Sequence, residues 1–210
     1  VLKLGLWKTD WGDVGIYLLL GIISMLVGLV FLLPCIVFLV HREKEPSKFT
    51  IPLTTRPLGV RRVVQSAIYG FLFFWPIVFL FEMGAMKLVP LLWPEAVPQT
   101  NVVKLREGEW QVQTQIAISA LIVAPVTEEL FFRGILYRIL KRVISIGPAM
   151  FVTSFAFAIV HINLLAFTPL FVLSFCLILS YERTGHLGVP ILYHCIFNLV
   201  GVVSILYGSH

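Results

Sequence analysis

The middle of the chain reads Ile116-Ala-Ile-Ser-Ala-Leu-Ile-Val-Ala-Pro-Val-Thr-Glu-Glu-Leu-Phe-Phe-Arg-Gly-Ile-Leu-Tyr137, an apolar segment interrupted by Glu128, Glu129 and Arg133. About 20 apolar residues are enough to cross a bilayer as a helix, so this segment predicts a membrane span. A charge at the bilayer centre costs about 2.5–3.5 kcal/mol on insertion scales. Charges kept at that cost indicate either a functional site or an ion pair that holds helices together.

The composition of the whole chain is that of a membrane protein. Hydrophobic residues make up 59% of the 210 residues, and the mean hydropathy is +0.94, whereas soluble domains have about 45–50% apolar residues. The apolar runs are continuous, which excludes a transmembrane barrel, because barrel strands alternate apolar and polar residues. We therefore predict an all-α, polytopic membrane helical bundle of about six transmembrane helices, forming a single membrane domain over 1–210.

Six apolar runs are the expected spans. The first run, 16–40, is too long for a signal-peptide core of about 7–15 residues and predicts a retained span. The fourth and fifth are separated only by Asn163 and Leu164, which predicts a tight helical hairpin. Met83–Trp93 is too short to span and contains Lys87, so it is expected to lie at the membrane interface. The runs are 16–40, 63–81, 115–137, 147–162, 165–181 and 189–207.

The distribution of charge predicts orientation and excludes one class of partner. The net charge of +5 comes from basic residues divided among short loops, without a basic stripe for nucleic acid. The positive-inside rule places the basic loops 41–62 and 138–146 in the cytoplasm, with both termini outside. The expected surroundings are a lipid bilayer: the plasma or inner membrane of a bacterium, or the endoplasmic reticulum of a eukaryote. The cysteines lie inside apolar runs and are expected to be inert; they are Cys35, Cys176 and Cys195.

The two adjacent glutamates predict different roles. Neighbouring helical positions are about 100° apart, so Glu128 and Glu129 cannot face the same target. Arg133 lies four residues after Glu129, the spacing at which helical side chains meet, and we expect the two to pair. Glu128 is then left on a neighbouring face, where a desolvated carboxylate suits a general base. Pro125 removes one helical hydrogen bond, which is expected either to kink the helix or to admit water there.

Polar residues in the later spans are the second sign of chemistry. His161 follows Phe157 by one turn, with Asn163 close behind, and His194 and Asn198 share a helix face at i and i+4. A single histidine in an apolar helix is more often a hydrogen-bonded core residue than a catalyst. A carboxylate pair with two histidines and an asparagine, on three apolar helices, favours a site that activates water and moves a proton.

These residues form three motifs in a familiar order. Glu128-Glu129-Leu-Phe-Phe-Arg133, Phe157-Ala-Ile-Val-His161 and His194-Cys-Ile-Phe-Asn198 follow the patterns Glu-Glu-x-x-x-Arg, Phe-x-x-x-His and His-x-x-x-Asn. The chain thus resembles the CPBP (Abi) family of intramembrane proteases, which contains the type II CAAX prenyl endopeptidases and bacteriocin-processing relatives. The resemblance covers about 115–207, which would be a catalytic core of four helices.

The resemblance implies a role for each matching residue. Glu128 would activate water, which His161 would help to hold, while His194 and Asn198 would stabilise the oxyanion. Glu129 and Arg133 would support them. If a metal such as zinc is used, Glu128, His161 and His194 would be its three ligands; a metal-free, glutamate-based hydrolysis needs the same residues. The usual zinc motif His-Glu-x-x-His is absent from the sequence.

Three functions remain open on the sequence. The first is an intramembrane endopeptidase that cleaves a membrane-associated peptide or protein, with a prenylated CAAX substrate only in a host that prenylates proteins. The second is a catalytically silent immunity or scaffold protein whose polar cluster only joins helices. The third is a proton-coupled transporter, since glutamates and histidines can relay protons in membranes. The lack of detectable internal repeats disfavours the transporter, because many transporters are built from duplicated halves.

Overall fold

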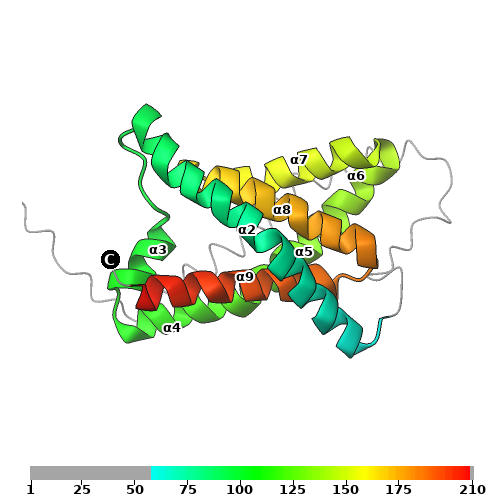
Figure 1. Cartoon of the computed structure of the whole chain (residues 1–210), viewed down its shortest axis with the longest axis horizontal. Coiled ribbons are helices and arrows are strands. Elements are labelled where there is room, and N and C mark those ends of the chain that lie inside the picture. The colour runs from blue at the N-terminus through cyan, green and yellow to red at the C-terminus, as the bar shows by residue number, and fades with distance from the viewer. Residues whose placement is uncertain (1–57, 209–210) are drawn as a thin grey trace, which may run out of the picture. The chain divides into compact units, whose positions relative to one another are not determined.

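The computed structural model describes residues 58–208, and the regular elements in this part of the chain are helices (Figure 1), which confirms the all-α prediction. The chain divides into two units, Val1–Thr50 and Ile51–His210, and all described residues belong to the second. The expected span 16–40 and nearly all of the loop 41–62 lie outside the described residues. Cys35, His41 and His210 lie outside them as well.

The first described helix is longer than the sequence indicated. Helix α2 runs over Val60–Leu92, 33 residues, and continues through Pro76 and Pro90. The prediction of a separate short element at Met83–Trp93 is wrong, because this segment is the C-terminal part of α2. Its few polar residues interrupt the apolar pattern but not the backbone hydrogen bonding. Hydropathy alone cannot distinguish an interrupted apolar run from the end of a helix.

Helix α2 packs on α8 (Leu164–Thr184) and α9 (Gly188–Tyr207). At Gly70 the helices approach closely: a Cβ atom there would lie 3.2 Å from Ser180 Oγ, tighter than ordinary van der Waals contact. The absence of a side chain at Gly70 therefore allows these helices to approach closely. A buried cluster fills this interface, with the members Ala67, Phe74, Val78, Leu173, Cys176, Leu177, Val189 and Tyr193.

The segment that carries the glutamates is one continuous helical run, Trp110–Val143, that contains two π-helical segments. It consists of α4 (Trp110–Ile118), the π-helical η2 (Ser119–Val123), α5 (Ala124–Glu129), the π-helical η3 (Leu130–Leu136) and α6 (Tyr137–Val143). The two π-helical segments flank α5, which bears Glu128 and Glu129. A short helix, α3 (Thr100–Glu107), precedes this run; its composition is polar, and the apolar pattern did not predict it.

The predicted hairpin is confirmed, but its first helix is short. Helix α7 covers Ile146–Ile159 and α8 begins at Leu164, where the Asn163 side chain accepts a hydrogen bond from Ala166 N. Fourteen residues give α7 a length of about 21 Å, less than the ~30 Å hydrocarbon core. His161 was predicted within a span; it lies instead in the turn after α7.

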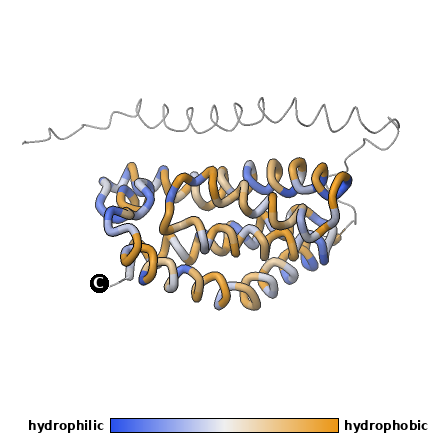
Figure 2. The backbone as a smooth tube through the Cα atoms, turned by 90° about the horizontal axis from the view of Figure 1, so that it is seen from above, coloured by the Kyte–Doolittle hydropathy of each residue, from blue (hydrophilic) through white to orange (hydrophobic). Residues whose placement is uncertain are grey.

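The described residues contain four helices long and apolar enough to cross a membrane: α2, Trp110–Val143, α8 and α9. Figure 2 shows hydrophobic residues along most of the backbone of these helices. Large side chains such as Leu72, Phe73 and Leu80 are exposed on α2, as expected for a surface that faces lipid tails. The protein is therefore an integral membrane protein, while its orientation in the membrane stays a prediction.

Candidate active site

The buried centre of the site is the ion pair predicted from spacing. Arg133 Nη1 donates to Glu129 Oε1 over 2.8 Å, and both side chains are completely buried. The two residues are one helical turn apart at the junction of α5 and η3. In a buried ion pair, the attraction between the two charges offsets the loss of their hydration. Removal of either residue would leave an unpaired buried charge, which is strongly destabilising.

Arg133 has two further partners that were not predicted from the sequence. Its Nη2 donates to the backbone oxygen of Ser174 over 3.0 Å and to Ser174 Oγ over 2.7 Å. Its guanidinium carbon lies 4.9 Å from the centre of the Phe157 ring, at cation–π distance. Ser174 is a small polar residue in the apolar run of α8, and this was the only signal for its role. Through Arg133 the glutamate helix is attached to both α7 and α8.

His194 stands between the two glutamates. Its Nδ1 lies 3.0 Å from Glu129 Oε1, and its Nε2 lies 4.0 Å from Glu128 Oε2. Because a carboxylate paired with Arg133 acts as an acceptor, the hydrogen of this bond belongs to Nδ1. The glutamates differ in access: the Glu128 side chain is 21% exposed, and that of Glu129 is 0% exposed. Glu128 is therefore the carboxylate that a substrate or a water molecule can reach.

Phe157 brings the second histidine to the same place. Its ring centre lies 5.0 Å from that of His161 and 6.0 Å from that of His194, and the side chain is fully buried. His161 Nδ1 lies 2.7 Å from the Phe157 backbone oxygen, which can only accept, so Nδ1 carries the hydrogen and Nε2 the lone pair. Phe157 thus contacts both histidines, and His194 in turn lies 4.0 Å from Glu128.

The turn that holds His161 contains an unusual backbone conformation. Ile162 has a φ of 46°, the only positive φ at a non-glycine residue in the described chain. A β-branched side chain rarely adopts this conformation, and such strain concentrates at functional sites. Asn163, the next residue, donates from Nδ2 to Val97 O over 3.0 Å, which joins the loop before α3 to this turn. The sequence pointed to Asn163 but not to this contact.

Asn198, one turn after His194 on α9, contacts the glutamate-bearing helical run at η2, before α5. Its Nδ2 donates to the backbone oxygen of Ala120 over 2.7 Å. Ala120 lies in η2, and its carbonyl was not predictable from the sequence as a partner. The amide nitrogen carries two hydrogens, so one remains for another acceptor.

The possible zinc ligands do not form a ligand set in this arrangement. Within 58–208, no three His, Cys, Asp or Glu side chains lie close enough together to hold a metal ion. Glu128, His161 and His194, the ligands implied by the resemblance, are neighbours but stand too far apart to share an ion. The reaction steps proposed below therefore use side chains alone.

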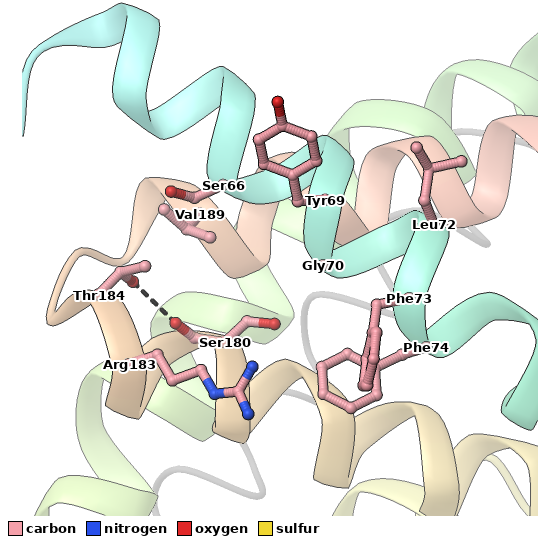
Figure 3. A pocket seen from close by; sticks show the side chains of 10 residues that line it. All are labelled: Ser66, Tyr69, Gly70, Leu72, Phe73, Phe74, Ser180, Arg183, Thr184 and Val189. Carbon is pink, nitrogen blue, oxygen red and sulfur yellow. Dashed lines mark hydrogen bonds between the residues drawn. The ribbon is translucent and has the colours of Figure 1, made fainter.

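A groove elsewhere in the protein is separate from this site. It has a volume of about 630 Å³ and lies between α2, the end of α8 and the start of α9 (Figure 3). None of the polar site residues lines it. Tyr193, which packs toward α2, precedes His194, which faces the glutamates, so α9 separates the groove from the site. The groove is lined by Ser66, Tyr69, Gly70, Leu72, Phe73, Phe74, Ser180, Arg183, Thr184 and Val189.

Comparison with known proteins agrees with the three motifs. Residues 110–200 match the family model described as type II CAAX prenyl endopeptidase Rce1-like, and this range includes Glu128, Glu129, Arg133, His161, His194 and Asn198. No curated protein and no solved structure matches the chain. The resemblance stated from the motifs is confirmed over the segment that carries them. Residues 110–200, the part of this chain that bears the site, are thus similar to the Rce1-like type II CAAX prenyl endopeptidases.

Proposed function

We propose that this protein is an intramembrane endopeptidase that hydrolyses a peptide bond in a membrane-associated protein or peptide. The observation that carries the proposal is the unequal environment of the two glutamates. Glu129 is enclosed and bonded to Arg133 and His194, whereas Glu128 is reachable and unbonded beside His194 Nε2. A purely structural ion pair needs only the enclosed glutamate. The second glutamate, kept at the cost of desolvation, suits a general base.

The first step is the attack of water. Glu128 takes a proton from a water molecule while the oxygen forms a bond to the carbonyl carbon of the scissile peptide. His161 supports this step, because its Nε2 lone pair accepts the other hydrogen of the water and orients it. The Nδ1 bond to Phe157 O maintains this tautomer. The second step breaks the C–N bond, and Glu128 returns the proton to the leaving nitrogen.

Between these steps the carbonyl oxygen carries negative charge. His194 Nε2 and the second hydrogen of Asn198 Nδ2 are the donors proposed for it. For Nε2 to donate while Nδ1–H is bonded to Glu129, His194 must be an imidazolium. Two carboxylates, one guanidinium and one imidazolium then sum to zero net charge, which is the least costly state for a buried cluster. Glu129, Arg133 and Ser174 would act by holding His194 rather than by touching the substrate.

The substrate proposed from the family is a prenylated CAAX-type protein, and the test compares it with other peptides. Purified full-length protein in liposomes would be incubated with a farnesylated CAAX peptide, the same peptide without the farnesyl group, and an unrelated membrane-tethered peptide. We expect cleavage of the farnesylated peptide by wild type and none by Glu128→Gln. Cleavage of the other peptides alone would reject the prenyl requirement. Silence on all three, with folded protein, would favour an immunity or scaffold role.

A chelator and a metal add-back would be run with the same substrates. Loss of cleavage with chelator and recovery with zinc would contradict the metal-free steps and would require the three ligands to move together. Unchanged rates would support the glutamate-based reaction.

A further inference from the structure

The bond between Asn198 and Ala120 has a cause in the local backbone. In the π-helical turn η2, Ala124 N–H donates to Ser119 O, five residues back. The next donor in this register would be the N–H of residue 125, directed at Ala120 O. Residue 125 is proline, which has no N–H. The Ala120 carbonyl therefore lacks a donor within its own helix, and Asn198 Nδ2 supplies one from α9 at 2.7 Å.

We infer that Pro125 is a positioning residue: by leaving the Ala120 carbonyl without a helical partner, it creates the acceptor that fixes the Asn198 carboxamide. A partly buried carbonyl without a hydrogen-bond donor destabilises the folded protein, so the side chain that donates to it is strongly held. The bond uses one of the two hydrogens on Nδ2 and sets the plane of the amide group. The other hydrogen then has a defined direction.

The location of this arrangement ties it to the site rather than to packing alone. Pro125 is fully buried three residues before Glu128, on the helix that carries the general base. Asn198 lies one turn after His194 on α9. The bond therefore links the helix that bears the base with the helix that bears both proposed oxyanion donors. That the free hydrogen of Nδ2 serves the oxyanion rests on the function proposed above; the positioning of Asn198 by Pro125 does not.

A double-mutant cycle on stability tests the positioning without any assay of activity. The variants are Pro125→Ala, Asn198→Leu and the double variant, with equilibrium unfolding followed in mixed detergent micelles. With Pro125 present, Asn198→Leu leaves the Ala120 carbonyl unpaired, and we expect the folding equilibrium constant to fall about tenfold. In the Pro125→Ala background, the new backbone N–H reaches Ala120 O directly, or that of Ala124 does so if the turn relaxes to α-helix. The same Asn198→Leu change should then cost less than about twofold.

Pro76→Ala is the matched control, because Pro76 also lies inside a long helix but is exposed and belongs to α2, not to the helix that carries the Ala120 carbonyl. Its effect should add to that of Asn198→Leu without coupling. An equal loss for Asn198→Leu in the wild-type and Pro125→Ala backgrounds would overturn the inference. No loss from Asn198→Leu in the otherwise wild-type chain would overturn it as well.

Kinetics then separate this inference from the proposed function. On a cleaved substrate, Pro125→Ala should lower kcat about tenfold with KM unchanged, because Asn198 loses its fixed orientation only where the transition state needs it. Pro76→Ala should change neither constant. A rise in KM alone would contradict the link to the oxyanion. If the stability cycle shows coupling and wild type cleaves nothing, the proposed function fails and the positioning of Asn198 by Pro125 stands.

Discussion

His194 Nδ1 lies 3.0 Å from Glu129 Oε1, and this bond determines which part of the histidine can take part in chemistry. The same carboxylate oxygen accepts from Arg133, so it is held by donors from two helices. With Nδ1 engaged, only Nε2 is directed at Glu128. A buried acid that orients a histidine is common at hydrolytic sites, because it limits ring rotation and stabilises the imidazolium.

Replacement of the reachable glutamate should abolish hydrolysis without unfolding the protein. Glu128→Gln keeps the shape of the side chain but cannot take a proton from water. We expect kcat to fall roughly a hundred- to ten-thousandfold, with the thermal midpoint nearly unchanged. The measurement is cleavage of the farnesylated CAAX peptide in liposomes, together with thermal unfolding in detergent.

The control for this variant is Glu82→Gln, which changes another glutamate in a long apolar helix, α2, outside the site. It should leave cleavage at the wild-type rate. Full activity in Glu128→Gln would show that another group activates the water.

Removal of the buried arginine should act mainly on stability. Arg133→Ala leaves Glu129 charged and enclosed, and breaking a buried pair in this way costs about 3–5 kcal/mol. The free energy of unfolding in mixed micelles measures the loss. Lys141→Ala is the comparison: its pair with Glu182 is 31% and 26% exposed, and we expect about 1 kcal/mol or less there. Equal losses in the two variants would mean that Arg133 is not a buried anchor.

The contact between Arg133 and Ser174 predicts a smaller effect at a residue remote in sequence. Ser174→Ala removes a hydroxyl that accepts from a charged group, and bonds of that kind contribute about 1.5–3 kcal/mol. Ser180→Ala, on the same helix, removes a hydroxyl that donates to Cys176 O within α8. It should cost less than about 1 kcal/mol. A Ser174→Ala protein as stable as Ser180→Ala would contradict the proposed anchoring of Arg133.

The strained turn beside His161 predicts a stabilising substitution. Asparagine tolerates the left-handed conformation that Ile162 adopts at φ 46°, and the strain for an ordinary residue is about 1–2 kcal/mol. Because the Ile162 side chain is 91% exposed, little packing is lost. We expect Ile162→Asn to raise the free energy of unfolding by about 1 kcal/mol. Ile162→Val, still β-branched, should give no gain; an equal gain from both would show that strain is not the cause.

Much of the fold was predictable because lipid restricts the choice. In hydrocarbon every backbone group must be paired within its own segment, so long apolar runs can only be helices. The runs at 115–137, 165–181 and 189–207 and the hairpin at Asn163 were predicted on this basis and agree with the structure. The length of α2, the shortness of α7 and the polar helix α3 were not predictable in this way, since hydropathy reports burial in lipid and not where hydrogen bonding ends.

Composition and spacing within one helix were sufficient to predict the membrane setting, the helical fold and the Glu129–Arg133 pair. The motifs also singled out Glu128, His161, His194 and Asn198. The packing of the helices determined their environments and partners. Glu129 is buried whereas Glu128 is partly exposed. Arg133 donates to Ser174, and Asn198 donates to the Ala120 carbonyl. The last two relations join residues 41 and 78 positions apart. They depend on how helices pack against one another, which periodicity within a single helix does not specify.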